Sequence, residues 1–183
     1  MKQFVLRIPI LGKSFILQFR IWYNKISTHY GVTNETHDGY FLPFWDFAEE
    51  FKVKDILSAL YKSQIEFGLS TIYVFQSSPT ESYRAISFDK LTWTRCLGVI
   101  GSTDCLDHKY LDFSILRGRF VLRMTEKELR QELLAMKIPS NFKMRPISDD
   151  HQAFFSVKYP EIPKPVPYPD KVKVQLSQYE SFR

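Results

Sequence analysis

The sequence predicts an α+β domain whose residues 38–127 form a ferredoxin-like βαββαβ core. Hydrophobic residues recur at helical spacing through residues 53–67, and β-branched or aromatic runs lie on both sides of that segment, at 40–46, 71–76, 83–88 and 120–124. The chain has 183 residues, of which 44% are hydrophobic and 16% aromatic. It therefore has ample material for a buried core.

The predicted domain covers residues 1–150 and opens with a β-hairpin within residues 1–24. Two β-rich runs, 3–11 and 14–23, are separated by Gly12 and Lys13, and in the second run Phe15, Leu17, Phe19 and Ile21 alternate with Ile16, Gln18, Arg20 and Trp22. Such alternation is typical of strands with two different faces.

An extended, Pro-rich segment is expected from residue 151 to residue 183. Five prolines occur between Tyr159 and Pro169. Proline lacks a backbone N–H, so this run favours a polyproline-like strap over a helix or a central strand.

The first half of the core is expected to contain a strand, a helix and a hairpin. Tyr40–Asp46 is the predicted central strand, the helix over 53–67 is expected to end at Gly68, and residues 71–76 pair with 83–88. Gly68 suits a helix C-cap because glycine adopts a positive φ without strain.

The second half is expected to contain a helix over residues 91–100, a strand over Phe120–Met124 and a charged helix over Glu126–Met136, capped by Thr125. Right-handed crossovers would then place the strand at 40–46 between its two neighbours, with the helices on one face of the sheet.

Composition favours an anionic partner and a reducing compartment. Lys and Arg number 25 against 20 Asp and Glu, which gives a net charge of +5 and suits nucleic acid. The two cysteines, Cys96 and Cys105, form no CxxC motif, so reduced thiols in the cytoplasm are expected. Arg7, Lys13 and Arg20 interrupt the apolar N-terminal stretch, so neither export nor a membrane partner is expected.

The predicted strand order brings one carboxylate close to two guanidinium groups. Asp46 ends the first strand of the core, and Arg84 and Arg123 lie on the strands expected beside it. A carboxylate at this position can hold a divalent cation, and flanking arginines can bind phosphates. A structural ion pair is the alternative interpretation.

The progression GYFLPFWDFAEE, a helix, IYVFQSSPTESYRAISF, TDCLD and GRFVLRMTEK resembles the RRM-like palm of the archaeo-eukaryotic primase and primase-polymerase superfamily, over about residues 38–127. The resemblance implies that Asp46 and Asp107 are metal ligands for Mg²⁺ or Mn²⁺. It also implies that Glu49 replaces a further catalytic acid.

The chain departs from this family at two positions. Ala48 stands where the resemblance implies a second aspartate, and Arg84 stands where it implies a histidine. Two-metal catalysis needs several carboxylates, so a palm that binds nucleic acid without catalysis is the preferred interpretation.

Basic and aromatic residues near the last strand are the candidates for nucleic-acid binding. Arg119 and Arg123 share the polar face of the strand by period-two alternation. The full set of candidates is Tyr83, Arg84, Arg117, Arg119, Arg123 and Lys127. Tyr40 and Phe44, together with Tyr83, are candidates to stack on bases. A solvated edge strand and ordinary core burial are the alternatives.

No other chemistry has a complete motif. The four histidines, His29, His37, His108 and His151, share no metal-ligand spacing and are expected at the surface. Asp104, Asp107 and Asp112 form a short acidic cluster that gives a weak metal signal.

Three functions follow from these observations. The leading hypothesis is a single-stranded nucleic-acid-binding protein of a replication or mobile-element system, with a non-catalytic, primase-like palm. The second is a divergent metal-dependent primase or DNA polymerase. The third is a protein-interaction module that offers its Pro-rich C-terminal segment to a partner.

Overall fold

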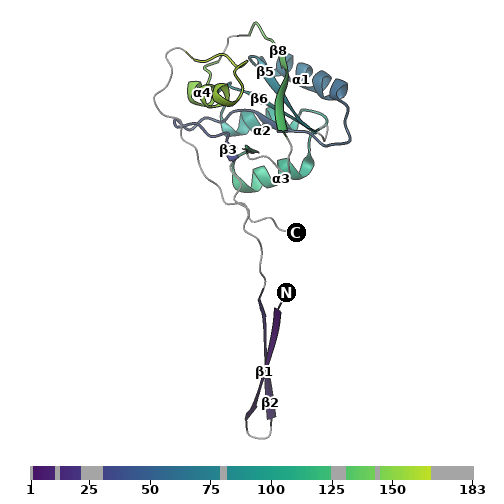
Figure 1. Ribbon diagram of the computed structural model, residues 1–183. Helices are drawn as coiled ribbons and strands as arrows, with labels where there is room; N and C mark the ends of the chain where they lie inside the picture. Colours follow the sequence, from purple (N-terminus) through teal and green to yellow (C-terminus); the bar gives the residue numbers. More distant parts are fainter. Residues whose placement is uncertain are drawn as a thin grey trace. The chain divides into compact units, whose positions relative to one another are not determined.

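The computed structural model describes residues 2–10, 13–21, 31–78, 82–124, 131–142 and 145–165, with the backbone alone for the first two ranges. The chain divides into two compact units (Figure 1). One unit comprises Met1–Thr28 with Gln178–Arg183, and the other comprises His29–Ser177.

The first unit contains the predicted hairpin. Strands β1 (Lys2–Ile10) and β2 (Lys13–Ile21) pair antiparallel, with Leu6 opposite Leu17. The hairpin expected from the alternating sequence is therefore confirmed.

The second unit is a mixed α+β structure around a four-stranded antiparallel sheet of order β4-β6-β5-β8. These strands are β4 (Phe44–Asp46), β5 (Ile72–Ser78), β6 (Ser82–Ser87) and β8 (Gln131–Ile138). The predicted hairpin of β5 and β6 and the pairing of the Asp46 strand with β6 are both confirmed.

The position of the Asp46 strand differs from the prediction. β4 lies at an edge of the four-stranded sheet and not at its centre. The expected second neighbour, β7 (Val121–Arg123), pairs instead with β3 (Gly31–Thr33) in a separate two-stranded sheet. The predicted ferredoxin-like strand order is therefore wrong.

Asn34 explains why the last predicted strand pairs elsewhere. The backbone N–H of Asn34 donates to the carbonyl of Phe120 (3.0 Å), and the N–H of Phe120 donates to the side-chain oxygen of Asn34 (2.9 Å). Asn34 also donates to the carbonyl of Leu42 (2.8 Å). These buried hydrogen bonds join the segment after β3 to the start of β7.

The predicted helix over Glu126–Met136 is wrong where the structure describes it, because residues 131–136 belong to β8. Thr125 and residues 126–130 lie outside the described residues. The Glu, Leu, Ala and Met of this segment favour a helix in isolation, but pairing with β5 outweighs that propensity. Exposure alternates along the strand, with Leu133 and Lys137 exposed and Leu134 and Met136 half-buried.

Four helices are described in the second unit: α1 (Val53–Phe67), α2 (Trp93–Gly101), α3 (His108–Arg117) and α4 (Asp149–Lys158). Gly68 follows α1 with φ of 61°, so the predicted C-cap is confirmed. The helix predicted over 91–100 corresponds to α2.

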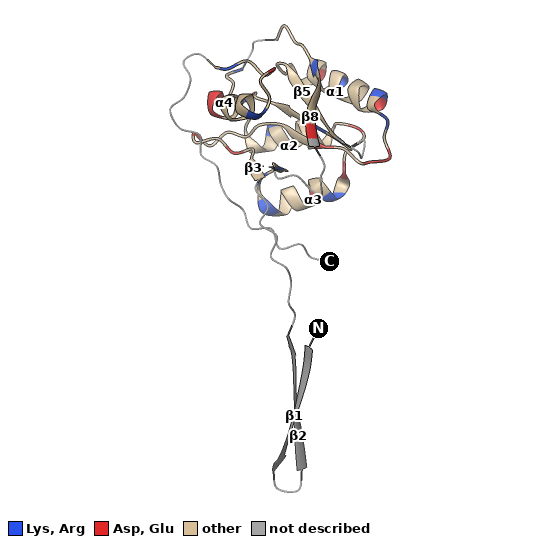
Figure 2. Ribbon diagram, in the orientation of Figure 1, with Lys and Arg blue, Asp and Glu red and all other residues tan. Residues whose placement is uncertain are grey.

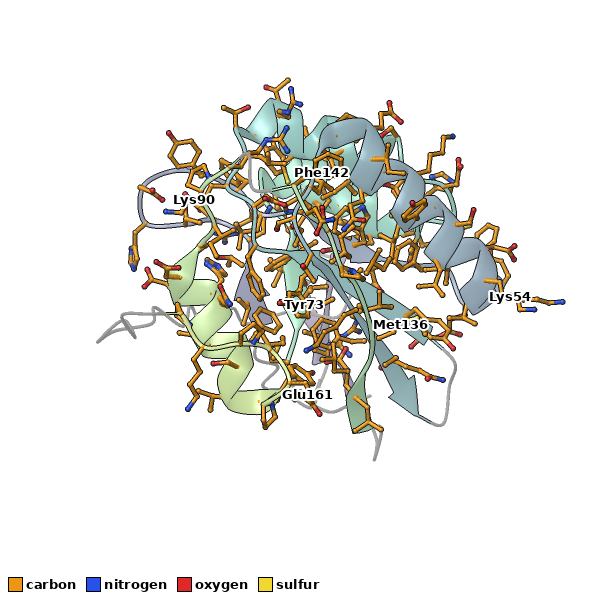
Figure 3. All side chains as sticks on the ribbon, turned by 90° about the horizontal axis from the view of Figure 1, so that it is seen from above. Lys54, Tyr73, Lys90, Met136, Phe142 and Glu161 are labelled. Atoms are coloured by element: carbon orange, nitrogen blue, oxygen red, sulfur yellow. The ribbon has the colours of Figure 1, made fainter. Side chains whose placement is uncertain are left out.

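Helices cover both faces of the sheet, whereas the sequence predicts them on one face only (Figures 1 and 3). On one face Phe75 packs against Phe155 of α4, with ring centroids 6.0 Å apart. On the opposite face the indole of Trp45 donates to Thr103, whose hydroxyl contacts Ser63 of α1. An open sheet platform for bases is therefore not present on the α4 face.

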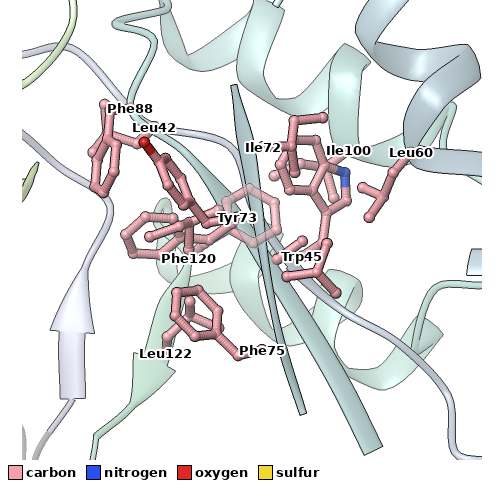
Figure 4. Close-up of a cluster of buried hydrophobic side chains, with 14 of the residues drawn as sticks. Leu42, Trp45, Leu60, Ile72, Tyr73, Phe75, Phe88, Ile100, Phe120 and Leu122 are labelled. Atoms are coloured by element: carbon pink, nitrogen blue, oxygen red, sulfur yellow. The ribbon is translucent and has the colours of Figure 1, made fainter. Parts of the chain in front are cut away.

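The core is continuous from the sheet to the helices (Figure 4). Its largest fully buried side chains include Leu42, Phe44, Trp45, Leu60, Ile72, Ile86, Ile100, Phe120 and Phe155. Phe120 joins α2 and α3 to this core, because its ring packs against Trp93 and Tyr110.

The extended segment predicted from residue 151 begins with a helix instead. α4 places Phe155 in the core, and Tyr159 and Ile162 beyond the helix are also buried. Residues 166–183, which include the last two prolines of the run, lie outside the described residues. The prolines at 160, 163 and 165 lie beyond the end of α4, so they do not prevent the helix from forming.

Candidate functional site

The candidate site begins with a cross-strand ion pair. Asp46 of β4 lies directly opposite Arg84 of β6, which places both side chains on the same face of the sheet. The guanidinium Nε of Arg84 lies 3.5 Å from the carboxylate Oδ1 of Asp46. The proximity of Asp46 and Arg84 expected from the sequence is therefore confirmed.

Three further residues extend this pair into what we call the Arg84 cluster: Asp46, Arg84, Glu132, Lys158 and Tyr159. Arg84 Nη1 lies 3.3 Å from Glu132 Oε1. The hydroxyl of Tyr159 donates to Glu132 Oε2 at 2.8 Å, and Lys158 Nζ lies 3.8 Å from the same oxygen. The cluster thus connects β4, β6, β8 and the end of α4.

Arg123 contacts Arg84 through its main chain. Arg84 Nη1 donates to the backbone carbonyl of Arg123 at 3.1 Å. β7 is thus tied to the cluster through its main chain. Arg84 itself lies between the carboxylates of Asp46 and Glu132.

Burial and charge act in opposite directions on these groups. Burial raises the pKa of Asp46, and the neighbouring Arg84 opposes that shift. Burial alone would lower the pKa of Arg84, but the charges of Asp46 and Glu132 raise it above its usual value. Arg84 therefore stays charged. Its position between two carboxylates is typical of a structural ion pair.

The proposed metal ligands are only partly brought together. The backbone N–H of Asp107 donates to the carbonyl of Asp46 at 3.0 Å, so the two segments are adjacent. The carboxylate of Asp107 caps α3 by accepting from the N–H of Lys109 at 2.9 Å and of Tyr110 at 3.4 Å. Glu49 is exposed in the turn after β4. Within the ranges that the structure describes, no three His, Cys, Asp or Glu side chains form a group able to hold a metal ion.

The proposed nucleic-acid residues have different environments. Tyr83 is buried, and Arg119 and Arg123 are half-buried on either side of the buried Phe120 and Leu122, as the alternation predicts. Arg117 is exposed on α3. Lys127 lies outside the described residues. Of the aromatic residues proposed to stack on bases, Phe44 and Tyr83 are buried and Tyr40 is exposed.

Sequence reasoning missed an exposed apolar surface on α3. Phe113 is 55% exposed and Leu116 is 82% exposed. The guanidinium carbon of Arg117 lies 5.6 Å from the centre of the Phe113 ring, within the range of a cation–π contact. The helical spacing of these residues could have been recognised, but their exposure depends on which face of α3 packs inward.

His151 also differs from the prediction. The sequence predicts it at the surface, but its side chain is mostly enclosed. Its Nε2 donates to the carbonyl of Thr33 at 2.9 Å, which leaves Nδ1 to accept from the hydroxyl of Ser148 at 2.9 Å. The ring also lies edge-on to Phe44. These contacts fit the neutral imidazole.

The enclosed histidine predicts a pH dependence of stability. Burial lowers the pKa of His151, although the Thr33 carbonyl opposes this shift. The unfolded chain then binds a proton more readily, so the free energy of unfolding should fall as pH falls below the ordinary value of about 6.5. NMR titration should place the His151 midpoint below about 6.5, and a midpoint at or above that value would contradict the assignment. His151→Asn should reduce the slope of stability against pH in this window.

The fold and the cluster together define a mixed α+β protein in which a polar ion-pair cluster lies between a sheet and its C-terminal helix. No family model, curated protein or solved structure matches the chain. Among the helices in the described part of the chain, none has the length and apolar character needed to cross a membrane.

Proposed function

We propose that this chain is a single-stranded nucleic-acid-binding protein of a replication or mobile-element system that does not catalyse nucleotidyl transfer. The exposed surface of α3 is the observation that carries the proposal. It combines an aromatic ring, Phe113, with a guanidinium group in contact with that ring. Aromatic stacking together with arginine is a common way to hold unpaired bases.

The two aspartates predicted to be metal ligands support a non-catalytic role. Asp46 is paired with Arg84, and Asp107 caps α3. A cation at Asp46 would compete with the guanidinium of Arg84 for the same carboxylate oxygen. Both aspartates therefore have structural roles that do not require a metal.

Phe113→Ala should weaken binding to a single-stranded oligonucleotide by about 5- to 150-fold, because one base–aromatic stack contributes about 1–3 kcal/mol. Fluorescence anisotropy with labelled DNA and RNA at about 50 mM salt measures this change, since phosphate contacts are strong at low salt. Tyr61→Ala is the matched control, because Tyr61 is a similarly exposed aromatic residue on α1. Equal losses in both variants would argue against the α3 surface.

A polymerase assay distinguishes the nucleic-acid-binding function from the polymerase alternative. Template, nucleotides and either Mg²⁺ or Mn²⁺ are supplied to the native chain and to Asp46→Asn. We expect neither to make product and both to bind the oligonucleotide. Product made by the native chain and lost in Asp46→Asn would establish the polymerase alternative.

A further inference from the structure

The net positive charge of the chain is confined to its first 28 residues. This segment holds five cations and no acid: Lys2, Arg7, Lys13, Arg20 and Lys25. The whole chain has 25 Lys and Arg against 20 Asp and Glu, so the remaining residues hold 20 of each sign. The +5 excess therefore belongs to the N-terminal unit, and the rest of the chain is formally neutral.

The second unit shows this balance along its elements (Figure 2). Lys62 pairs with Asp104, and Lys90 pairs with Asp38. In the Arg84 cluster, the charges of Arg84 and Lys158 are matched by two carboxylates. Attraction to a polyanion depends on cations in excess of acids, because each phosphate contact releases a bound counterion. The second unit alone has no such excess.

The register of the hairpin sorts its four strand cations onto two faces. Directly opposed residues share a face, and faces alternate along each strand. One face holds Arg7 and Arg20, and its other positions are Gln3, Val5, Pro9, Ser14, Ile16 and Gln18. The other face holds Lys2 and Lys13 at its ends, with apolar residues at Phe4, Leu6, Ile8, Ile10, Phe15, Leu17, Phe19 and Ile21.

The arginine face has the composition of a phosphate-binding ribbon. Arg20 lies opposite Gln3, four residues along β1 from Arg7, so the two arginines are about 13 Å apart along the hairpin. Arginine binds phosphate oxygens with a two-pronged fork of donors, and glutamine and serine add neutral donors. A two-stranded ribbon of this kind also has no acid to repel the phosphates.

From the charge separation and the register, we propose that the face of the hairpin carrying Arg7 and Arg20 is the phosphate-contacting element of this protein. This inference rests on the proposed function. The hairpin supplies the electrostatic attraction to the nucleic-acid backbone, and the neutral second unit supplies the base contacts at Phe113.

Three double charge reversals test the proposal in the full chain, each changing the net charge by the same amount: Arg7→Glu with Arg20→Glu, Lys2→Glu with Lys13→Glu, and Lys54→Glu with Lys164→Glu. Lys54 and Lys164 are exposed residues of the second unit. Anisotropy against a labelled single-stranded 20-mer is recorded over a series of salt concentrations. Circular dichroism verifies that each variant is folded.

The arginine pair should lower affinity at least tenfold and should reduce the slope of log K against log salt by about 1.4, which corresponds to two phosphate contacts. The Lys54 and Lys164 pair should lower affinity by less than about threefold. Equal losses in these two variants, or an unchanged arginine variant, would overturn the proposal while the proposed function stands. A native chain that binds no oligonucleotide would overturn the proposed function itself.

A basic hairpin could also bind an anionic lipid surface, and anionic vesicles distinguish this partner from nucleic acid. If the native chain sediments with vesicles of about 30% anionic lipid and Lys2→Glu with Lys13→Glu releases it, while Arg7→Glu with Arg20→Glu leaves oligonucleotide affinity unchanged, the hairpin serves a lipid surface and the proposal is wrong. The expected result is that the chain stays in the supernatant.

Discussion

Replacing Arg84 with methionine should lower the free energy of unfolding by about 3 kcal/mol. The side chains of Asp46 and Glu132 are only 27% and 13% exposed, and both carboxylates contact this guanidinium. Removal of Arg84 leaves two like charges facing each other across the sheet without a cation between them. Methionine keeps most of the side-chain volume, so the loss reports on charge and not on a cavity.

Urea unfolding, followed by the linear extrapolation of the free energy, measures this loss. Arg95→Met is the control, because Arg95 is exposed on α2 and its replacement should change stability by less than about 0.5 kcal/mol. If both variants lose the same small amount, the Arg84 cluster does not stabilise the fold.

A further variant separates charge imbalance from lost packing. Arg84→Met combined with Asp46→Leu and Glu132→Leu removes all three charges together. Buried ion pairs replaced by apolar residues of similar size are often neutral or stabilising, so this variant should recover most of the lost stability. Stability that stays low would indicate that the hydrogen bonds of Tyr159 and Arg123 to the cluster carry more of the energy.

Local signals in the sequence were sufficient for the elements that depend on them. The helix at Val53–Phe67 was predicted with its bounds, because its apolar spacing and the glycine that ends it are both local. The two hairpins were predicted because each consists of two β-rich runs joined by a short segment that favours a turn. Each of these elements satisfies its backbone hydrogen bonds with near neighbours in the chain.

Elements that depend on distant partners were missed. β8 is composed of good helix formers, and only its pairing with β5 makes it a strand. β7 was correctly predicted as a strand, but its partner β3 is a three-residue strand next to a polar loop. A strand of three residues carries too little periodicity for a sequence pattern to reveal it.

The candidate site shows the same division. The pair of Asp46 and Arg84 was predicted because two neighbouring strands bring them together. Glu132 was missed because its segment was predicted to be helical. Lys158 and Tyr159 were missed because the chain beyond residue 150 was expected to be extended. Two errors in local structure therefore removed three of the five residues of the cluster.

The C-terminal helix is the element for which the structure differs most from the expectation, so its contribution to stability is the sharpest test of the fold. Phe155 is 2% exposed. Its ring lies 6.2 Å from that of Phe44 on β4 and 6.0 Å from those of Phe75 and Phe88. An aromatic side chain that joins α4 to three separate segments should be among the most sensitive positions in the chain.

Phe155→Ala should lower the free energy of unfolding by about 3–5 kcal/mol, because it removes a large buried side chain and leaves a cavity between α4 and the sheet. Val157→Ala is the matched control, since Val157 lies two residues away on the same helix and is 69% exposed. It should cost less than about 0.5 kcal/mol. Urea unfolding of both variants measures the difference. If Phe155→Ala lowers the free energy of unfolding no more than Val157→Ala does, then residues 151–165 contribute little to the core. That result would agree with the extended segment predicted from the sequence.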